Sequence, residues 1–284
     1  MPNREPLRIA VFGAHPADVI WHSAGTMAVH ASRNDEVLAV PVTYGARHCN
    51  PFLAPTDESG YRPLEEVKAR KLKETQKACK ILGVQLHQLD FKDQIFVGTH
   101  EEIQEITDVI RGFRADIVIT HHPTDTAFAD QPDHGTVGAA VMRAVKYANE
   151  WGAESKKPAC QVNTVLLWPA HPDTAMYRVT PNMTPPNYYV DISDVIDLKR
   201  QALRCLGGSM LVTEESADGI IRAQGVRNGG AAGLAHAEAY VYTAPFVVKH
   251  LSKREMGPVR QMLLPRGWTV EDYLKALGSG PKDN

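Results

Sequence analysis

Cysteine is scarce in this sequence, and the few that occur follow no recognisable spacing. No two of them form a C-x-x-C pair, and they stand far apart, at Cys49, Cys79, Cys160 and Cys205. This distribution argues against a disulfide framework and favours a reducing compartment. The N-terminal stretch MPNREPLRIAVF carries charges but lacks the apolar segment of a signal peptide. We therefore expect a cytoplasmic protein.

Long hydrophobic runs and blocks of like charge are also lacking. No apolar stretch approaches the ~20 residues that a membrane-spanning helix needs. Lys and Arg total 31 against 33 for Asp and Glu, a net charge of -2, and no long basic block occurs. Because nucleic-acid-binding surfaces carry clustered positive charge, we expect neither a nucleic acid nor a membrane as a partner.

Three common enzyme motifs are missing as well. The stretch FGAHPAD (12–18) lacks the G-x-G-x-x-G of a dinucleotide fold. The chain contains no G-x-x-x-x-G-K-[ST] loop and no G-x-S-x-G nucleophile elbow. Dinucleotide-dependent redox chemistry, nucleotide triphosphate hydrolysis and serine hydrolysis are therefore disfavoured.

What the sequence does contain is an alternation of short apolar runs and helical patterns. The runs span residues 7–14, 37–44, 85–90, 116–122, 164–170 and 187–192. Their continuous apolar character predicts strands buried on both faces, as in a parallel sheet. Helical patterns lie between them, at residues 64–82, 101–114 and 137–151. The pattern predicts an α/β fold, a Rossmann-like doubly wound and mostly parallel sheet flanked by helices.

The chain shows no convincing linker, so a single domain over residues 1–277 is expected. The tail GSGPKDN (278–284) is expected to be disordered. Two polar or glycine-rich stretches interrupt the alternation, at 45–63 and 225–236, and both are predicted to be loops.

Histidines and carboxylates follow the predicted strands, where ligands of open α/β sheets bind. In chain order they include His15, Asp18, His48, Asp93, His121, His122, Asp125, His171 and Asp173. His15 and Asp18 flank Pro16, which suits the first position of a helix, and both can face one point across that turn. One more histidine would make a catalytic type of zinc site with an open position. The alternative is a helix-start carboxylate beside a core histidine.

The chain resembles the LmbE/PIG-L family of zinc-dependent N-deacetylases. The matching landmarks are AHPAD (14–18), TYG (43–45), LDFKD (89–93), PDHGTVG (132–138) and AEAYVY (237–242). The resemblance implies that His15, Asp18 and His134 bind Zn²⁺ or another divalent metal, and it implies a homo-oligomer.

One departure from the family pattern is informative. The deacetylases usually read AHPDD, whose first aspartate is the general base, and this chain has Ala17 there. A hydratase-like branch, acting on 4-oxalomesaconate in gallate breakdown, has the similar pattern A-H-x-A-D-x-x-W. The similarity extends through YVDISDVIDLKR (189–200), CLGG (205–208) and GVRN (225–228). The glutamate of that branch is matched here by Ala46.

These observations predict a zinc-dependent hydratase that acts on a small, acidic, unsaturated oxo-acid. His171 is the first candidate for acid/base work because histidine titrates near neutral pH; a histidine in a surface turn is the alternative. Asp125 and Asp133 are further candidates, although Asp133 could instead orient a ligand histidine.

Substrate binding is assigned to three arginines and one histidine. Arginines pair with carboxylates, although most surface arginines are simply solvated. The predicted set is Arg47, Arg222, Arg227 and His122. Two other functions stay open. One is an N-deacetylase in which His171, Asp125 or Asp130 replaces the missing base. The other is a non-catalytic module that binds a metal or ligand.

Overall fold

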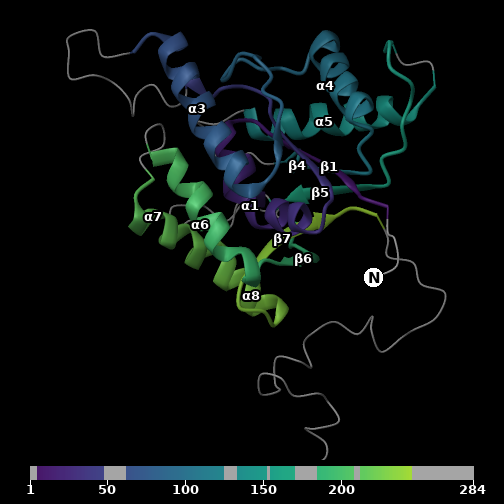
Figure 1. Cartoon of the computed structure of the whole chain (residues 1–284). Coiled ribbons are helices and arrows are strands. Elements are labelled where there is room, and N and C mark those ends of the chain that lie inside the picture. Colours follow the sequence, from purple (N-terminus) through teal and green to yellow (C-terminus); the bar gives the residue numbers. More distant parts are fainter. Residues whose placement is uncertain are drawn as a thin grey trace, which may run out of the picture.

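One seven-stranded sheet organises the part of the chain that the structure describes (Figure 1). The structure is a computed structural model. It describes residues 5–47, 62–124, 133–151, 154–169, 184–207 and 212–244. The predicted domain end at residue 277 and the predicted tail 278–284 lie outside these residues.

The sheet is mostly parallel, and its strand order is β3-β2-β1-β4-β5-β7-β6. The parallel strands are β1 (Arg8–Gly13), β2 (Glu36–Pro41), β3 (Gln85–Leu86), β4 (Ile117–His121) and β5 (Thr164–Trp168). Two strands complete one edge, β6 (Tyr188–Asp191) and β7 (Ala237–Tyr242), and β7 is antiparallel to both its neighbours. The predicted α/β class with a mostly parallel sheet is confirmed.

Helices cover both faces of the sheet and enclose two apolar cores. On one face lie α1 (Pro16–Ser32), α3 (Leu64–Leu82) and α6 (Ile196–Arg204). On the other lie α4 (His100–Phe113) and α5 (Asp133–Asn149), drawn in teal in Figure 1. This is the doubly wound arrangement that the alternating pattern predicts. Among the described helices, none combines the length and the apolarity needed to cross a membrane.

The helix ends follow the local sequence. α3 ends where predicted, because Gly83 adopts φ 72° and its N–H bonds the last turn. α4 begins after Thr99, whose side chain accepts the Glu102 N–H in a capping box. α5 begins at Asp133, four residues before the predicted start at 137, and this places His134 in its first turn.

The prediction of a loop over 225–236 is wrong for residues 225–232, whereas residues 233–236 do connect α8 to β7 without regular structure. This region contains the end of the π-helical turn η3 (Ile221–Val226) and α8 (Arg227–Ala232), after the short helix α7 (Glu214–Ile220). One of its glycines allows close packing, because a Cβ on Gly229 would lie 2.7 Å from the Leu234 carbonyl oxygen. Two short 3-10 turns, η1 (Ser193–Val195) and η2 (Cys205–Gly207), flank α6.

Candidate metal centre

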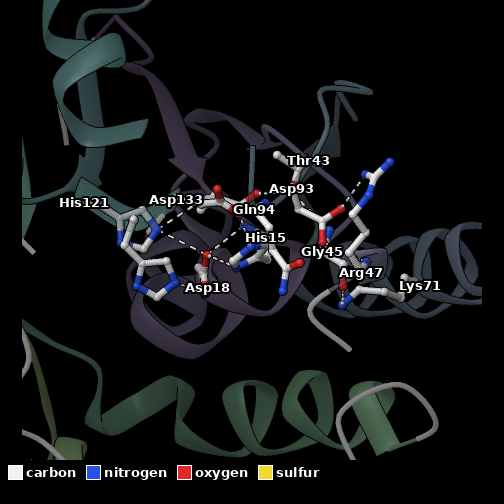
Figure 2. A network of polar contacts seen from close by, with 12 residues as sticks. His15, Asp18, Thr43, Gly45, Arg47, Lys71, Asp93, Gln94, His121 and Asp133 are labelled. Carbon is white, nitrogen blue, oxygen red and sulfur yellow. Dashed lines mark hydrogen bonds and ion pairs between the residues drawn. The ribbon is translucent and has the colours of Figure 1, made fainter. Parts of the chain in front are cut away.

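Two histidines and one aspartate converge where β1 ends and α5 begins (Figure 2). Ligand atoms of His15, Asp18 and His134 all lie within 4.8 Å of one another. The three residues are at most 8% exposed. A buried set of two imidazoles and one carboxylate is suited to a divalent metal, and zinc accepts both donor types.

The turn from β1 into α1 fixes the first two of these residues. The His15 N–H donates to Asp18 Oδ2 at 2.7 Å, which ties both residues to the first turn of α1. Pro16 occupies the first helical position, where its missing N–H costs nothing. Gly13 permits the tight approach, because a Cβ there would lie 2.9 Å from Val19 Cγ1.

Asp133 orients the His15 ring. Its Oδ2 lies 3.2 Å from His15 Nε2 and also accepts the Gln94 N–H at 2.7 Å. The other ring nitrogen, Nδ1, faces Asp18 Oδ2 at 3.4 Å. If Nε2 carries the proton that it gives to Asp133, the Nδ1 lone pair points into the cluster, as a metal ligand requires. The sequence left open which histidine Asp133 would orient, and the histidine that it contacts in the structure is His15.

His121, at the end of β4, contacts this cluster, and its neighbour His122 is the histidine predicted to bind substrate. His121 Nε2 lies 3.2 Å from Asp18 Oδ2 and 3.1 Å from the Ala14 N–H donor. Its ring stacks on that of His134, with centroids 4.2 Å apart. His122 instead contacts Thr124 through Nδ1. The alternation of side chains along a strand is the signal that separates two adjacent histidines, but the sequence does not show which face meets the site.

The charges of the cluster oppose the effect of burial. Burial alone lowers the pKa of His15, but the Asp18 charge and the hydrogen bond to Asp133 outweigh it and raise this pKa to about 9. Burial raises the pKa of Asp18, yet the charges of His134 and His15 hold it well below its usual value. Protons therefore occupy the metal-free cluster near neutral pH, and a metal must displace them.

A second layer extends from the His15 ring toward α3. Gly45, at φ 60°, packs against His15, and a Cβ there would lie 2.8 Å from the ring carbon Cδ2. The Gly45 carbonyl oxygen accepts from Nζ of Lys71 at 3.4 Å, and Lys71 is buried. Nearby, Arg47 donates its N–H to Asp93 at 2.8 Å and pairs with it through Nη1 at 3.6 Å. Predicted Arg47 thus lies in this layer, and Lys71 is a buried cation that sequence analysis missed.

The two positions where the family resemblance leads us to expect a carboxylate are buried alanines. Ala17 is 5% exposed and packs in the apolar core beneath α1. Ala46 is 1% exposed and packs with Val67. Neither position offers a proton acceptor, and the surroundings of each are apolar.

The remaining predicted residues stay predictions. His171 and Asp125 lie outside the described residues. Arg222, on η3, and Arg227, at the start of α8, are both exposed.

Comparison with known proteins identifies relatives of two kinds. Residues 10–145 match the family model described as PIG-L: GlcNAc-PI de-N-acetylase. A diacetylchitobiose deacetylase of Thermococcus kodakarensis is 28% identical over 209 residues, which cover 72% of this chain and 70% of that protein. A 4-oxalomesaconate hydratase of Pseudomonas putida is 25% identical over 202 residues, 70% of this chain and 72% of that protein.

The fold is similar to that of a solved hydratase. The crystal structure of the 4-carboxy-2-hydroxymuconate hydratase of Pseudomonas putida aligns with a TM-score of 0.72 and 22% identity. The alignment covers 87% of this chain and 100% of that one. At this identity the likeness concerns the fold.

Proposed function

Since residues 10–145 match the PIG-L (LmbE-like) family model, we propose that this chain is a zinc-dependent hydratase of a small unsaturated oxo-carboxylic acid. The observation that carries the proposal is Ala17, which stands between the ligands His15 and Asp18 without a carboxylate. The hydratase pattern has alanine at this place, whereas the deacetylase pattern has its general base there. The relative named as a hydratase, similar over 70% of this chain, supports the same choice.

The donor set fits zinc. His15, Asp18 and His134 would bind the ion and leave a coordination position for the reactants, as in catalytic zinc sites. Bound Zn²⁺ would supply Lewis-acid activation of water and of a substrate oxygen. Asp133 would keep the His15 ring in the orientation and tautomer that ligation requires.

The other residues of the site would bind the acid and move its protons. Arg47 and Lys71 place positive charge beside the cluster, which suits a substrate with carboxylates. His171 remains the proposed proton carrier. Hydration of a conjugated oxo-acid needs a group that delivers a proton to carbon and a group that accepts a proton from water. The side chains of Ala17 and Ala46 can do neither.

The test is direct turnover. Zinc-loaded protein is mixed with 4-oxalomesaconate, and the loss of the conjugated chromophore is followed. We expect the wild-type protein to turn the substrate over. A chelator should abolish this turnover, added zinc should restore it, and the Asp18→Ala variant should show none. A verified substrate that stays unchanged with the zinc-loaded wild type would reject this assignment.

N-deacetylation is the second candidate, and the 28% identical deacetylase is the observation that favours it. This reaction needs a base other than residue 17, and Asp125, Asp130 or His171 would have to supply it. Acetate release from N-acetyl sugars, or from conjugates that contain them, would support this function. A panel of such substrates that yields no acetate would count against it.

A further inference from the structure

Gln94 adopts a backbone conformation that normally belongs to glycine. Its φ is 68°, in the left-handed region that costs most residues with a Cβ free energy relative to glycine. Two other described residues with side chains have positive φ, Asn34 and Arg114. Arg114 caps α4 and Asn34 follows the cap of α1, and helix ends commonly use this conformation.

Gln94 has no such helical reason, because it lies in the loop between β3 and α4. The loop is fixed on both sides of it. The buried Asp93 accepts the Arg47 N–H, and the buried Phe96 stacks on Phe91 with ring centroids 5.6 Å apart. The strained residue is therefore held firmly in place, although its own side chain is exposed.

The strained peptide is connected to the metal centre. The Gln94 N–H and His15 Nε2 meet at the same oxygen, Oδ2 of Asp133, at 2.7 Å and 3.2 Å (Figure 2). The Gln94 side chain therefore starts from a backbone that lies beside His15, and this side chain is exposed. Glycine would make the same backbone bond without strain, so the bond to Asp133 does not explain why glutamine is present.

We propose that Gln94 determines specificity by donating its side-chain amide to a carboxylate or carbonyl oxygen of the small oxo-acid substrate. This inference rests on the proposed function for its substrate class. Because the loop already holds the Gln94 backbone, binding has to order only the side chain, which favours recognition of one oxygen in a fixed place. Strained residues gather at functional sites because their surroundings hold them there.

The experiment compares Gln94→Gly, Gln94→Ala and a matched control, Arg114→Gly, in the zinc-loaded protein. Both glycine variants relieve positive φ and should raise Tm by about 2 °C. Gln94→Gly and Gln94→Ala should each raise KM for 4-oxalomesaconate at least about tenfold, because a hydrogen bond to a charged oxygen is lost. Arg114→Gly should leave KM unchanged. The zinc content of all three variants should equal that of the wild type. Gln94→Asn, which keeps an amide, should have a KM between those of the wild type and Gln94→Ala.

A second measurement separates this inference from the proposed function. Calorimetric titration with oxaloacetate reports binding of an oxo-acid whether or not the protein turns anything over. If wild-type protein fails to hydrate 4-oxalomesaconate but binds oxaloacetate, and Gln94→Gly weakens that binding about tenfold, the function is wrong and the inference stands. Unchanged KM and oxaloacetate affinity in Gln94→Gly, or no oxaloacetate binding by the wild type, overturns the inference.

Discussion

At the scale of single residues, Asp133 is a buried carboxylate that contacts a proposed metal ligand. It is 1% exposed and holds His15 Nε2. Replacing it with asparagine puts an amide in contact with Nε2 and removes the charge that favours the required tautomer. We expect Asp133→Asn to weaken zinc binding about 10–100-fold, measured by competition with a chelating indicator.

Asp93 provides the control for this prediction. It is equally buried and also accepts a backbone N–H, but its partner is Arg47. Asp93→Asn should therefore leave zinc affinity near that of the wild type. Equal affinities in the two variants would show that Asp133 does not act on the metal ligand.

At the residue scale, the sequence predicts contacts within one turn but not contacts between separate elements. His15 and Asp18 lie on one helical turn, so their proximity follows from local spacing alone. His121 and Lys71 belong to separate elements that approach the cluster only in the folded sheet. A choice between the adjacent residues His121 and His122 depends on which face of β4 meets the site, and local sequence does not fix it.

At the scale of elements, the contact between α5 and β4 sets the position of His134. Gly138 lies one turn after His134, and a Cβ there would stand 2.4 Å from the His121 carbonyl oxygen. Gly138→Ala should therefore push α5 away from β4. We expect a loss of about 1–3 kcal/mol in the free energy of unfolding, together with weaker zinc binding.

A glycine in open space serves as the comparison. A Cβ on Gly219, in α7, would have no atom within 4 Å among those of the described residues. Gly219→Ala should stabilise the protein by up to about 1 kcal/mol, because alanine favours helices, and should leave zinc binding unchanged. Denaturant titration of both variants, with parallel zinc measurements, tests the pair. A Gly138→Ala protein as stable as Gly219→Ala contradicts the close contact.

A buried ion pair joins α6 and β7 to α1. Lys199 Nζ lies 2.6 Å from Glu238 Oε1 and also donates to the Trp21 carbonyl oxygen at 2.9 Å. Glu238 accepts the N–H groups of Gly25 and Thr26, so the pair spans one turn of α1. Removing only the cation leaves a buried carboxylate without its counter-charge. Lys199→Met should cost about 3–5 kcal/mol of unfolding free energy, measured by urea denaturation.

The surface pair between Arg8 and Glu36 calibrates this effect. Its side chains are 40% and 47% exposed, at 3.4 Å. Glu36→Ala should cost less than about 1 kcal/mol because water screens the pair. If Lys199→Met costs no more than Glu36→Ala, the buried pair does not hold α1 in place.

At the scale of the whole molecule, the metal centre couples stability to pH. The pKa of His15 is about 9 in the folded metal-free protein and 6.5 when unperturbed. A raised pKa means that the folded state binds the proton more tightly. Its stabilising effect is complete below about pH 6.5 and is lost as pH rises to about 9. This loss amounts to about 3 kcal/mol.

We therefore expect chelator-treated protein to be less stable at pH 9 than at pH 6 in urea titrations. His15→Gln should remove most of this difference in stability. A small part should remain because other groups also titrate between pH 6 and pH 9. Saturating zinc should reverse the trend, because metal binding needs the neutral imidazole and strengthens as protons leave. A metal-free wild type that is equally stable at both pH values would contradict the pKa assigned to His15.

The sequence by itself determined those features that depend on local pattern. Continuous apolar runs specified the parallel strands, and Gly83 ended α3 at the predicted residue. The AHPAD turn placed two of the proposed metal ligands on one helical turn. Its Ala17 separated this chain from the standard deacetylase pattern. The glycine-rich stretch before β7 misled, because glycines are typical of loops but also occur in helices, as Gly229 does where a Cβ would meet the Leu234 carbonyl oxygen.

Only the tertiary structure decided what depends on contacts between distant elements. It brought His121 onto His134, Lys71 toward Gly45, and Gln94 to Asp133. It also placed β7 antiparallel in an otherwise parallel neighbourhood and joined Glu238 to α1. The partners in these pairs can lie far apart in the chain: Gly25 and Glu238 are separated by 213 residues. No short-range periodicity can encode which residues meet when the sheet closes around them.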